Sequence, residues 1–341
     1  MNGQDDIPDH SKSARPVRSS LLPWVVVLVT LALIGASFVV PVPSVLMFVP
    51  GPVKDVEQLI EVDGTDTFSS EGSLYLTTVG VDEQVTVAEW IWSYVDPETA
   101  AIDQDSFTQG LSIEELNRLQ RQQMTVSKRA AASVALTALG VDEQPGVEIK
   151  SVVGEPARGE LGSGDVIMSI EGESIGTDCD LLATVAQHSP GDTVELEVKN
   201  GSRSRVVDIR LGSAPDSSTR PFIGIEMSPD DFEPVEFEFK TGRIAGPSAG
   251  LMFSLALYDR LTPEDLTAGH RIAGTGEIGC DGAVGAIGGI EQKVAGAEAR
   301  DADIFLAPER NAEVAREVAE DIEVVAIGSF QDAVEHLESL D

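Results

Sequence analysis

The most informative part of the sequence is Gly274-Thr-Gly-Glu-Ile-Gly-Cys-Asp-Gly-Ala-Val-Gly-Ala-Ile-Gly-Gly-Ile-Glu-Gln-Lys-Val-Ala-Gly-Ala297. Short apolar runs between glycine-rich turns predict a strand, a turn, a second strand, another turn and a helix. The expected helix carries Lys293, the only lysine after Lys240. Its neighbours include the apolar residues Ile290 and Val294, and burial among such residues lowers the pKa of a lysine amine. Lys293 is therefore a candidate general base.

A second stretch supplies a candidate nucleophile. Thr241-Gly-Arg-Ile-Ala-Gly-Pro-Ser-Ala-Gly-Leu251 places Ser248 in a tight turn before Leu251–Leu261, an apolar run with helical character. Free N–H groups at a helix N-terminus favour a developing negative charge, which is what an oxyanion hole requires. A serine hydroxyl is a weak nucleophile until a base removes its proton. The residues expected to shape the oxyanion turn are Gly246, Pro247 and Ala249.

Together the two stretches resemble the proteolytic domain of the Lon peptidase family. In that family Gly-Pro-Ser-Ala-Gly carries the catalytic serine, and Thr-Gly-Glu-Ile followed by Ile-Gly-Gly-Ile-x-x-Lys carries the catalytic lysine. The resemblance implies that Ser248 is the nucleophile, Lys293 the general base and Thr275 a hydroxyl that helps to orient the lysine amine. Two departures, Ile244-Ala245 for Lys-Asp and Glu291-Gln292 for Lys-Glu, put substrate preference in doubt more than chemistry.

A rival interpretation of the serine motif is the nucleophile elbow of α/β-hydrolases, because Gly246-x-Ser248-x-Gly250 also fits that pattern. That fold needs an acid and then a histidine downstream, and only His270 and His336 follow the motif. His336 lies in a terminal helical run, where a solvated histidine is the plain interpretation. The pattern therefore favours the Lon-type assignment.

Residues 138–213 have a different texture, with short alternating strands and turn signals. Asn200-Gly201 between two alternating runs is the strongest short-range signal for a β-hairpin. The stretch Gly146–Val153 followed by Leu161–Ile175 resembles a bacterial PDZ domain. The expected elements are strands at 146–153, 165–170, 193–198 and 203–211 and a helix at 178–187.

The PDZ resemblance implies recognition of peptide C-termini, which such domains bind as an added strand beside a loop that holds the terminal carboxylate. Leu139, Gly140 and Val141 stand where that loop is expected, although Gly140 also suits the end of the preceding helix. The expected helix offers three apolar side chains that fit either the peptide groove or the core, namely Leu181, Leu182 and Val185.

The N-terminal region predicts a membrane anchor. Leu21–Val49 contains no charged side chain, and residues 21–40 match the roughly 20 apolar residues that cross a bilayer. A cleaved signal peptide is the competing interpretation, but the apolar run outlasts a typical signal core and no clear cleavage site follows it. The bases before the span, Lys12, Arg15 and Arg18, place the N-terminus in the cytoplasm and the rest outside.

The order of these segments resembles a family of bacterial membrane-anchored Lon-type peptidases that contain a PDZ domain. We therefore expect an α+β fold in which a β-rich PDZ-like domain is inserted into a Lon-type proteolytic domain, preceded by one transmembrane helix. A strand at 72–79 and helices at 84–95 and 112–139 represent the first part of the proteolytic domain. The expected segments are a cytoplasmic tail (1–20), the transmembrane helix (21–40), a linker (41–59), the first proteolytic part (60–137), the PDZ-like domain (138–213) and the second proteolytic part (214–341).

Composition restricts the partners. The formal net charge is −35, and so acidic a surface repels phosphate, which argues against nucleic-acid binding. The sequence has no Gly-Lys dipeptide and hence no P-loop for ATP. We expect no cofactor and no metal site, because the two cysteines have no clustered histidines. Whether Cys179 and Cys280 pair stays open, since an oxidising compartment permits a bridge without requiring one.

The predicted function is therefore an ATP-independent serine endopeptidase with a Ser248–Lys293 dyad. Its expected partners are unfolded or flexible polypeptides outside the membrane, delivered by their C-termini to the PDZ-like domain. Lon-like domains often assemble into rings, so a homo-oligomer fits the resemblance. The alternative is a catalytically silent, membrane-anchored PDZ scaffold in which the Ser248 turn only caps a helix.

Overall fold

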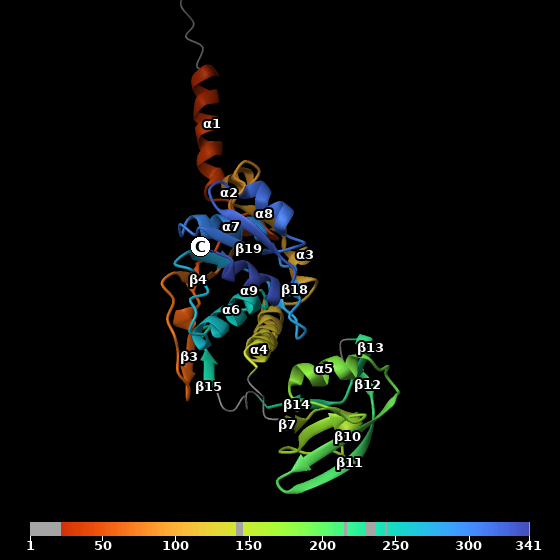
Figure 1. Ribbon diagram of the computed structural model, residues 1–341. Coiled ribbons are helices and arrows are strands. Elements are labelled where there is room, and N and C mark those ends of the chain that lie inside the picture. The colour runs from red at the N-terminus through yellow and green to blue at the C-terminus, as the bar shows by residue number, and fades with distance from the viewer. Residues whose placement is uncertain (1–21, 141–145, 215–216, 229–235, 243, 341) are drawn as a thin grey trace, which may run out of the picture.

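Figure 1 shows the computed structural model, which describes residues 22–140, 146–214, 217–228, 236–242 and 244–340. A large body contains the described residues of 41–140 and 236–340, and a small body contains those of 146–228. Helix α1 (Leu22–Ser37) projects from the large body at the end far from the small body. The small body is thus an insertion between two halves of the large body.

The large body is built on a five-stranded sheet with strand order β2-β4-β16-β19-β20, in which all strands except β2 run parallel. Side chains alternate across it, with Leu74, Leu76 and Leu306 in one apolar cluster and Tyr75 and Phe305 in another. Helices α4, α6 and α9 contribute to the first cluster, and α7 and α8 contribute to the second. Helices therefore cover both faces, as a parallel sheet requires. The bounds are β2 Lys54–Asp55, β4 Ser73–Leu76, β16 Arg271–Gly274, β19 Ile304–Pro308, β20 Glu323–Ile327, α4 Ile113–Ala138, α6 Gly250–Leu261, α7 Ile290–Glu298, α8 Ala312–Val318 and α9 Phe330–Glu338.

Shorter pairings extend the large body. Strand β1 (Val45–Pro50) lies between β5 (Val79–Asp82) and β6 (Ala100–Asp103), and β3 (Ile60–Asp63) pairs with β15 (Glu236–Phe239). Strands β17 and β18 form a hairpin that follows β16 and precedes α7 in the sequence. The remaining bounds are β17 Glu277–Ile278, β18 Val284–Gly285, η1 Glu57–Leu59, α2 Val87–Trp92 and α3 Gln104–Thr108.

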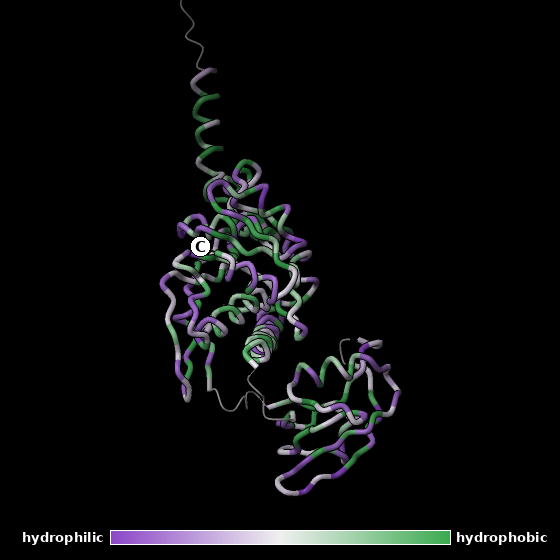
Figure 2. Tube along the Cα trace, viewed as in Figure 1, coloured by the Kyte–Doolittle hydropathy of each residue, from purple (hydrophilic) through white to green (hydrophobic). Residues whose placement is uncertain are grey.

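The small body has a sheet with strand order β11-β10-β8-β7-β14, with β9 paired to β8 and a separate hairpin β12–β13. Its core of aliphatic side chains includes Ile149, Ile167 and Leu196, and Figure 2 shows hydrophobic and hydrophilic residues alternating along these strands. The bounds are β7 Val147–Val152, η2 Glu155–Ala157, β8 Val166–Ile170, β9 Glu173–Ser174, α5 Asp178–Ala186, β10 Thr193–Asn200, β11 Arg203–Arg210, β12 Gly212–Ala214, β13 Ser217–Phe222 and β14 Ile225–Met227. The expected α+β fold with a β-rich PDZ-like insertion is present.

The N-terminal helix differs from its prediction. Helix α1 has 16 residues, about 24 Å at 1.5 Å per residue, whereas a hydrocarbon core measures about 30 Å. Within the part of the chain that the structure describes, no helix combines the length and apolarity needed to cross a membrane. The spanning helix expected over residues 21–40 is therefore not found. The helix ends at Ser37, and a turn in which the Val39 and Val40 N–H groups donate to the Ala36 carbonyl oxygen leads to Pro41.

Two expected segment limits also differ from the structure. Residues 41–59, expected as a linker, contain β1, β2 and η1, because their apolar side chains Leu46, Met47 and Val56 are buried in the large body. The PDZ-like sheet extends beyond residue 213, because β14 pairs with β7. These four elements each have six residues or fewer, and such short segments carry little periodicity in the sequence.

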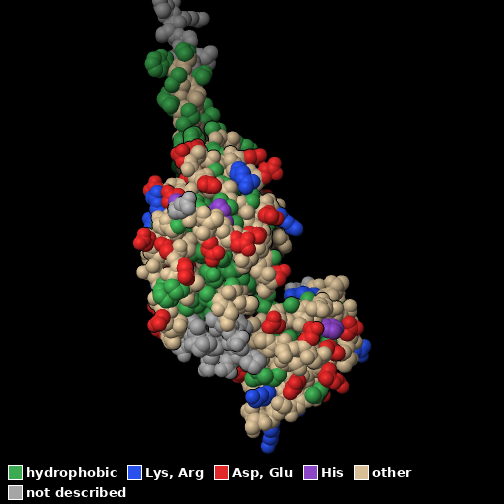
Figure 3. Space-filling view, viewed as in Figure 1, with side chains coloured by type: hydrophobic (Ala, Val, Ile, Leu, Met, Phe, Trp, Pro, Cys, Tyr) green, Lys and Arg blue, Asp and Glu red, His purple; other side chains and the backbone are tan. Residues whose placement is uncertain are grey.

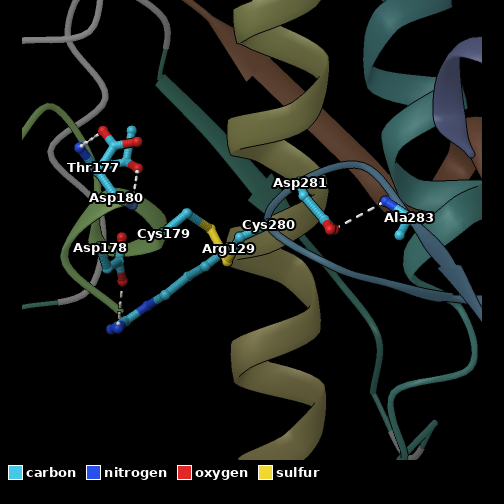
Figure 4. Close-up of a disulfide and its surroundings, with 8 residues drawn as sticks. All are labelled: Arg129, Thr177, Asp178, Cys179, Asp180, Cys280, Asp281 and Ala283. Carbon is cyan, nitrogen blue, oxygen red and sulfur yellow. Dashed lines mark hydrogen bonds and ion pairs between the residues drawn. A yellow bond between two sulfur atoms is a disulfide. The ribbon is translucent and has the colours of Figure 1, made fainter. Parts of the chain in front are cut away.

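The two cysteines join the bodies. Cys179, in the first turn of α5, forms a disulfide with Cys280, in the turn between β17 and β18 (Figure 4). Beside it Arg129 of α4 forms an ion pair with Asp178 of α5 at 2.9 Å, and both side chains are largely buried. The pairing that the sequence left open is therefore made, and it attaches the small body next to the turn that follows β17.

Candidate active site

The side chains of Ser248, Lys293 and Thr275 meet at one point of the large body. The Nζ atom of Lys293 lies 2.8 Å from the Oγ atom of Ser248 and 2.7 Å from the Oγ1 atom of Thr275. Ser248 precedes α6, Thr275 follows β16 and Lys293 lies in the first turn of α7. Residues 45 and 18 positions apart in the chain are thus within hydrogen-bonding distance of one amine.

The Ser248 turn is held by its backbone. Gly246 has φ +90°, a left-handed conformation that glycine adopts without strain. The carbonyl oxygen of Ser248 accepts hydrogen bonds from the Gly276 N–H and the Thr275 hydroxyl, both at 2.9 Å. The carbonyl oxygen of Pro247 accepts from the hydroxyl of Ser127, a residue of α4 that the sequence did not single out. Ser248 itself stays partly exposed.

Burial sets the protonation of the lysine. Lys293 is 3% exposed, and burial lowers the pKa of its amine to about 7, while the negative charge of Glu277 opposes that decrease. Burial in turn raises the pKa of the Glu277 carboxyl. A buried amine with a pKa near neutrality is free of its proton in a large fraction of molecules, which is the condition for a general base.

The turn before α7 explains how the lysine reaches the serine. Gly289 has φ +67°, and a Cβ atom there would lie 2.6 Å from the Val79 side chain. The second glycine of the Ile-Gly-Gly-Ile motif therefore lets α7 start close to β5. The apolar helix residues Ile290, Val294 and Ala297 are buried and anchor α7 against the sheet, so Lys293 projects toward Ser248.

The residues of the proposed oxyanion turn flank Ser248 at the start of α6. Gly246 and Pro247 directly precede Ser248, and Ala249 is the N-cap residue of α6. Pro247 has no N–H and the Gly246 N–H donates to the Gln120 carbonyl oxygen, so the Ser248 N–H is the donor of this turn that lies at the nucleophile, before the positive end of a 12-residue helix. The nearest base to the Ser248 hydroxyl among the described residues is Lys293, whereas His336, which the hydrolase interpretation requires, lies in α9.

The peptide-binding loop was expected at Leu139, Gly140 and Val141, but the strand that follows it has no unpaired edge. Leu139 is the C-cap residue of α4, and Gly140, at φ +65°, ends the helix; Val141 lies outside the described residues. Strand β7, which follows this loop, is paired on one side with β8 and on the other with β14. An added peptide strand therefore has no place beside β7.

The two end strands of this sheet are β11 and β14, and β14 is the one that pairs with β7. Within the described ranges, which exclude 229–235, β14 pairs only with β7 and ends the sheet. It follows the turn at Gly224, whose φ is +92° and whose Cα lies 2.9 Å from the position of a Cβ atom on Gly154. Strand β13, just before this turn, packs against α5. The sequence signal was Phe222-Ile223-Gly224-Ile225, an apolar run interrupted by glycine.

The structure distinguishes among the three residues of α5 that fitted either the peptide groove or the core. Leu181 and Val185 are buried in the core of the small body, at 2% and 7% exposure. Leu182 is 48% exposed on the surface of α5. Only Leu182 is therefore available to a bound peptide among these three.

Comparisons with known proteins match two different segments of the chain. A model of the Lon protease (S16) C-terminal proteolytic domain matches residues 238–338, and a model of the PDZ domain matches residues 124–211. Lon protease 2 of Bacillus subtilis is 28% identical over 33% of this chain and 20% of its own length. A probable periplasmic serine endoprotease DegP-like of Bartonella henselae is 34% identical over 23% of this chain and 16% of its own length.

A solved PDZ domain of an SdrC-like protein from Listeria innocua is 31% identical and covers 26% of this chain and 99% of its own, with a TM-score of 0.24. This chain spans 20% and 16% of the lengths of the two curated relatives named above. The matched segments support a serine peptidase that carries a Lon-type proteolytic segment and a PDZ segment.

Proposed function

We propose that the protein is a serine endopeptidase in which Ser248 is the nucleophile and Lys293 the general base. The observation that carries this proposal is the buried Lys293 amine 2.8 Å from the Ser248 hydroxyl, with a pKa of about 7. A silent scaffold has no need of a buried amine beside a partly exposed serine, because burying an ionisable group costs stability. The site therefore favours the peptidase over the silent alternative.

The reaction proceeds by acyl transfer. The neutral amine of Lys293 accepts the Ser248 proton while Oγ bonds to the carbonyl carbon of the scissile peptide, and N–H groups of the turn stabilise the oxyanion. The C–N bond then breaks, and the Lys293 ammonium donates its proton to the leaving amine. Water then attacks the acyl-enzyme while Lys293 accepts one of its protons; the bond from the acyl carbon to Oγ breaks, and the Lys293 ammonium returns the proton to Oγ, which releases the acid product and restores the Ser248 hydroxyl and the neutral amine.

Thr275 has a specific part in this scheme. Its hydroxyl group donates its proton to the Ser248 carbonyl oxygen at 2.9 Å. The Oγ1 atom of Thr275 therefore turns a lone pair toward the Lys293 amine, whose Nζ atom lies 2.7 Å away. An N–H bond of neutral Lys293 points to that lone pair, which leaves the lone pair of the amine for the Ser248 proton.

The test is hydrolysis of an unfolded, casein-like protein without ATP by a form that starts at residue 41 and so keeps β1. Ser248→Ala and Lys293→Met are expected to lose activity at least about a thousandfold. Ser254→Ala is the matched control, because Ser254 is buried in α6 and donates only to the Leu251 carbonyl oxygen. An active Lys293→Met variant would mean that another group is the base. ATP dependence of the parent form would contradict the ATP-independent part of the proposal.

We further propose that peptide substrates dock by strand addition to β14, guided by Leu182 of α5. The support is the unpaired edge of β14, because main-chain hydrogen bonds at such an edge bind extended peptides. Hydrogen exchange with peptides ending in a free or an amidated carboxyl group tests the site. Protection of residues 222–227 by the free acid only is the expected result, and protection centred on residues 139–141 contradicts it.

Attachment to a membrane through α1, with the large body outside the cytoplasm, also remains a proposal. Its support is the exposure of apolar side chains such as Trp24, Leu28 and Leu33, at 70%, 66% and 67%. In Figure 3 the side chains seen along α1 are hydrophobic. Extraction of the full chain from cell membranes at alkaline pH tests it. Release of the chain into the soluble fraction contradicts an integral anchor.

A further inference from the structure

The peptide groups on either side of Ser248 are fixed through their carbonyl oxygens. The Pro247 oxygen accepts from the Ser127 hydroxyl at 2.9 Å and from the Gly250 N–H at 3.2 Å. The Ser248 oxygen accepts from Thr275 and Gly276. Two donors therefore hold each carbonyl in one direction.

A fixed carbonyl also fixes the N–H of the same peptide group. The peptide unit is planar and trans, so its N–H points opposite to its C=O. The Pro247 carbonyl points to α4, which directs the Ser248 N–H away from α4. Among the residues that the structure describes, the Ser248 N–H donates to no protein acceptor. It is thus a preorganised donor beside the nucleophile, as an oxyanion hole requires.

Ser127 is built into this arrangement from a distant part of the chain. It is 3% exposed on α4, 120 residues before Pro247. A Cβ atom at position 250 would lie 2.7 Å from the Ser127 hydroxyl oxygen, so the glycine of the Pro-Ser-Ala-Gly motif makes room for it. The same helix accepts the Gly246 N–H through the Gln120 carbonyl oxygen. Helix α4 therefore contacts the turn at two points.

We propose that Ser127 is a positioning residue of the peptidase, which orients the Pro247–Ser248 peptide group so that the Ser248 N–H donates to the oxyanion. This inference rests on the proposed peptidase function. Ser127 touches neither the substrate nor the Lys293 amine in this scheme. Its effect is therefore expected on the transition state and not on binding of the substrate.

The test compares Ser127→Ala with Ser133→Ala. Ser133 is a second buried serine of α4, at 5% exposure, and lies about two turns further along the helix. Alanine suits a helix interior, and the Pro247 oxygen keeps its bond to the Gly250 N–H, so both variants are expected to fold. Ser127→Ala is expected to lower kcat about five- to tenfold with an unchanged KM, which is the effect of one hydrogen bond.

A peptide aldehyde gives the readout that a packing defect does not produce. It forms a hemiacetal whose oxygen occupies the oxyanion position, so its inhibition constant is expected to rise by the same factor in Ser127→Ala and to stay unchanged in Ser133→Ala. Equal behaviour of the two variants, or a change in KM alone, overturns the inference. A parent protein that neither cleaves peptides nor binds the aldehyde at Ser248 contradicts the peptidase itself, an outcome distinct from a failure confined to Ser127.

Discussion

The residues of the Ser248 site come from distant parts of the chain, whereas most contacts of the small body join strands that are close in sequence. The site combines Ser127, Ser248, Thr275 and Lys293, and its hydrogen bonds join residues that lie between 18 and 120 positions apart in the chain. The small body is built mainly from strands adjacent in the sequence, and its β10–β11 hairpin pairs over eight residues on each side. Long-range packing therefore defines the chemistry, whereas local patterns define most of the insertion.

The two regions also differ in exposure. Lys293 and Thr275 are 3% and 0% exposed, so protein atoms cover both side chains almost completely. The small body keeps the edge of β14 unpaired within the described residues. The disulfide and the Arg129–Asp178 ion pair connect the two regions at one place. Changes to the site are thus expected to alter the reaction, and changes to the junction are expected to alter mainly stability.

The largest expected effect is at Lys293. Lys293→Met removes the base and should reduce kcat/KM at least about a thousandfold, while it replaces a buried amine by an apolar side chain of similar length. The variant is therefore expected to unfold at a higher temperature than the parent at neutral pH. Peptide hydrolysis and thermal unfolding measure the two effects, and a destabilised variant would contradict the account of Lys293 burial.

A tenfold effect per pH unit is expected from the same amine. The reaction needs neutral Lys293, whose pKa is about 7, so kcat/KM should rise tenfold per unit below pH 7 and level off above it. The free energy of unfolding is expected to change with pH in the same direction as the rate. Between pH 7 and about 10 the unfolded lysine holds more protons than the folded one, so unfolding free energy rises with pH in that window.

Both slopes are checked on one preparation. A pH–rate profile gives the first, and urea unfolding at several pH values, compared between the parent and Lys293→Met, gives the second. The lysine-dependent rise in stability should be absent from Lys293→Met. A profile that is flat between pH 6 and 8 contradicts the assignment of the base.

A change of a few kcal/mol is expected at the junction. The double variant Cys179→Ser with Cys280→Ser removes a disulfide that closes a separation of 101 residues, and such a loss typically costs about 2–4 kcal/mol. Hydrolysis of short peptides should stay within about threefold, because the dyad and its supports lie within the large body. Urea unfolding and peptide hydrolysis measure the two quantities, with the parent under reducing conditions as the control. A complete loss of short-peptide hydrolysis would show that the junction shapes the site.

The smallest expected effect is at Glu277. Its negative charge raises the pKa of Lys293, so Glu277→Gln should move the rising limb of the pH–rate profile to lower pH. The maximum rate should change little, because Glu277 makes its contribution by charge. Asp281→Asn, in the nearby β17–β18 turn, is the control for a general loss of surface charge. A shift to higher pH in Glu277→Gln contradicts the electrostatic account.

The sequence by itself marked Ser248 and Lys293 as the candidate nucleophile and base and predicted most elements of the small body. Gly-Pro-Ser-Ala-Gly and Ile-Gly-Gly-Ile-x-x-Lys place Ser248 and Lys293 at helix starts because their glycines permit left-handed turns at Gly246 and Gly289. The hairpin signalled by Asn200-Gly201 formed as expected: Asn200 pairs with Arg203, and Gly201 takes a positive φ of +57° in the turn between them. These features depend on neighbours in the chain, so the sequence expresses them directly.

Only the tertiary structure decided which distant groups meet. Three contacts join residues 73 to 120 positions apart: the Cys179–Cys280 disulfide, the Ser127–Pro247 hydrogen bond and the pairing of β14 with β7. Such contacts follow from how helices and strands pack, and they leave no period in a single sequence. The end of α1 at Ser37 was likewise missed, because composition measures apolarity but not where the backbone hydrogen bonds of a helix stop.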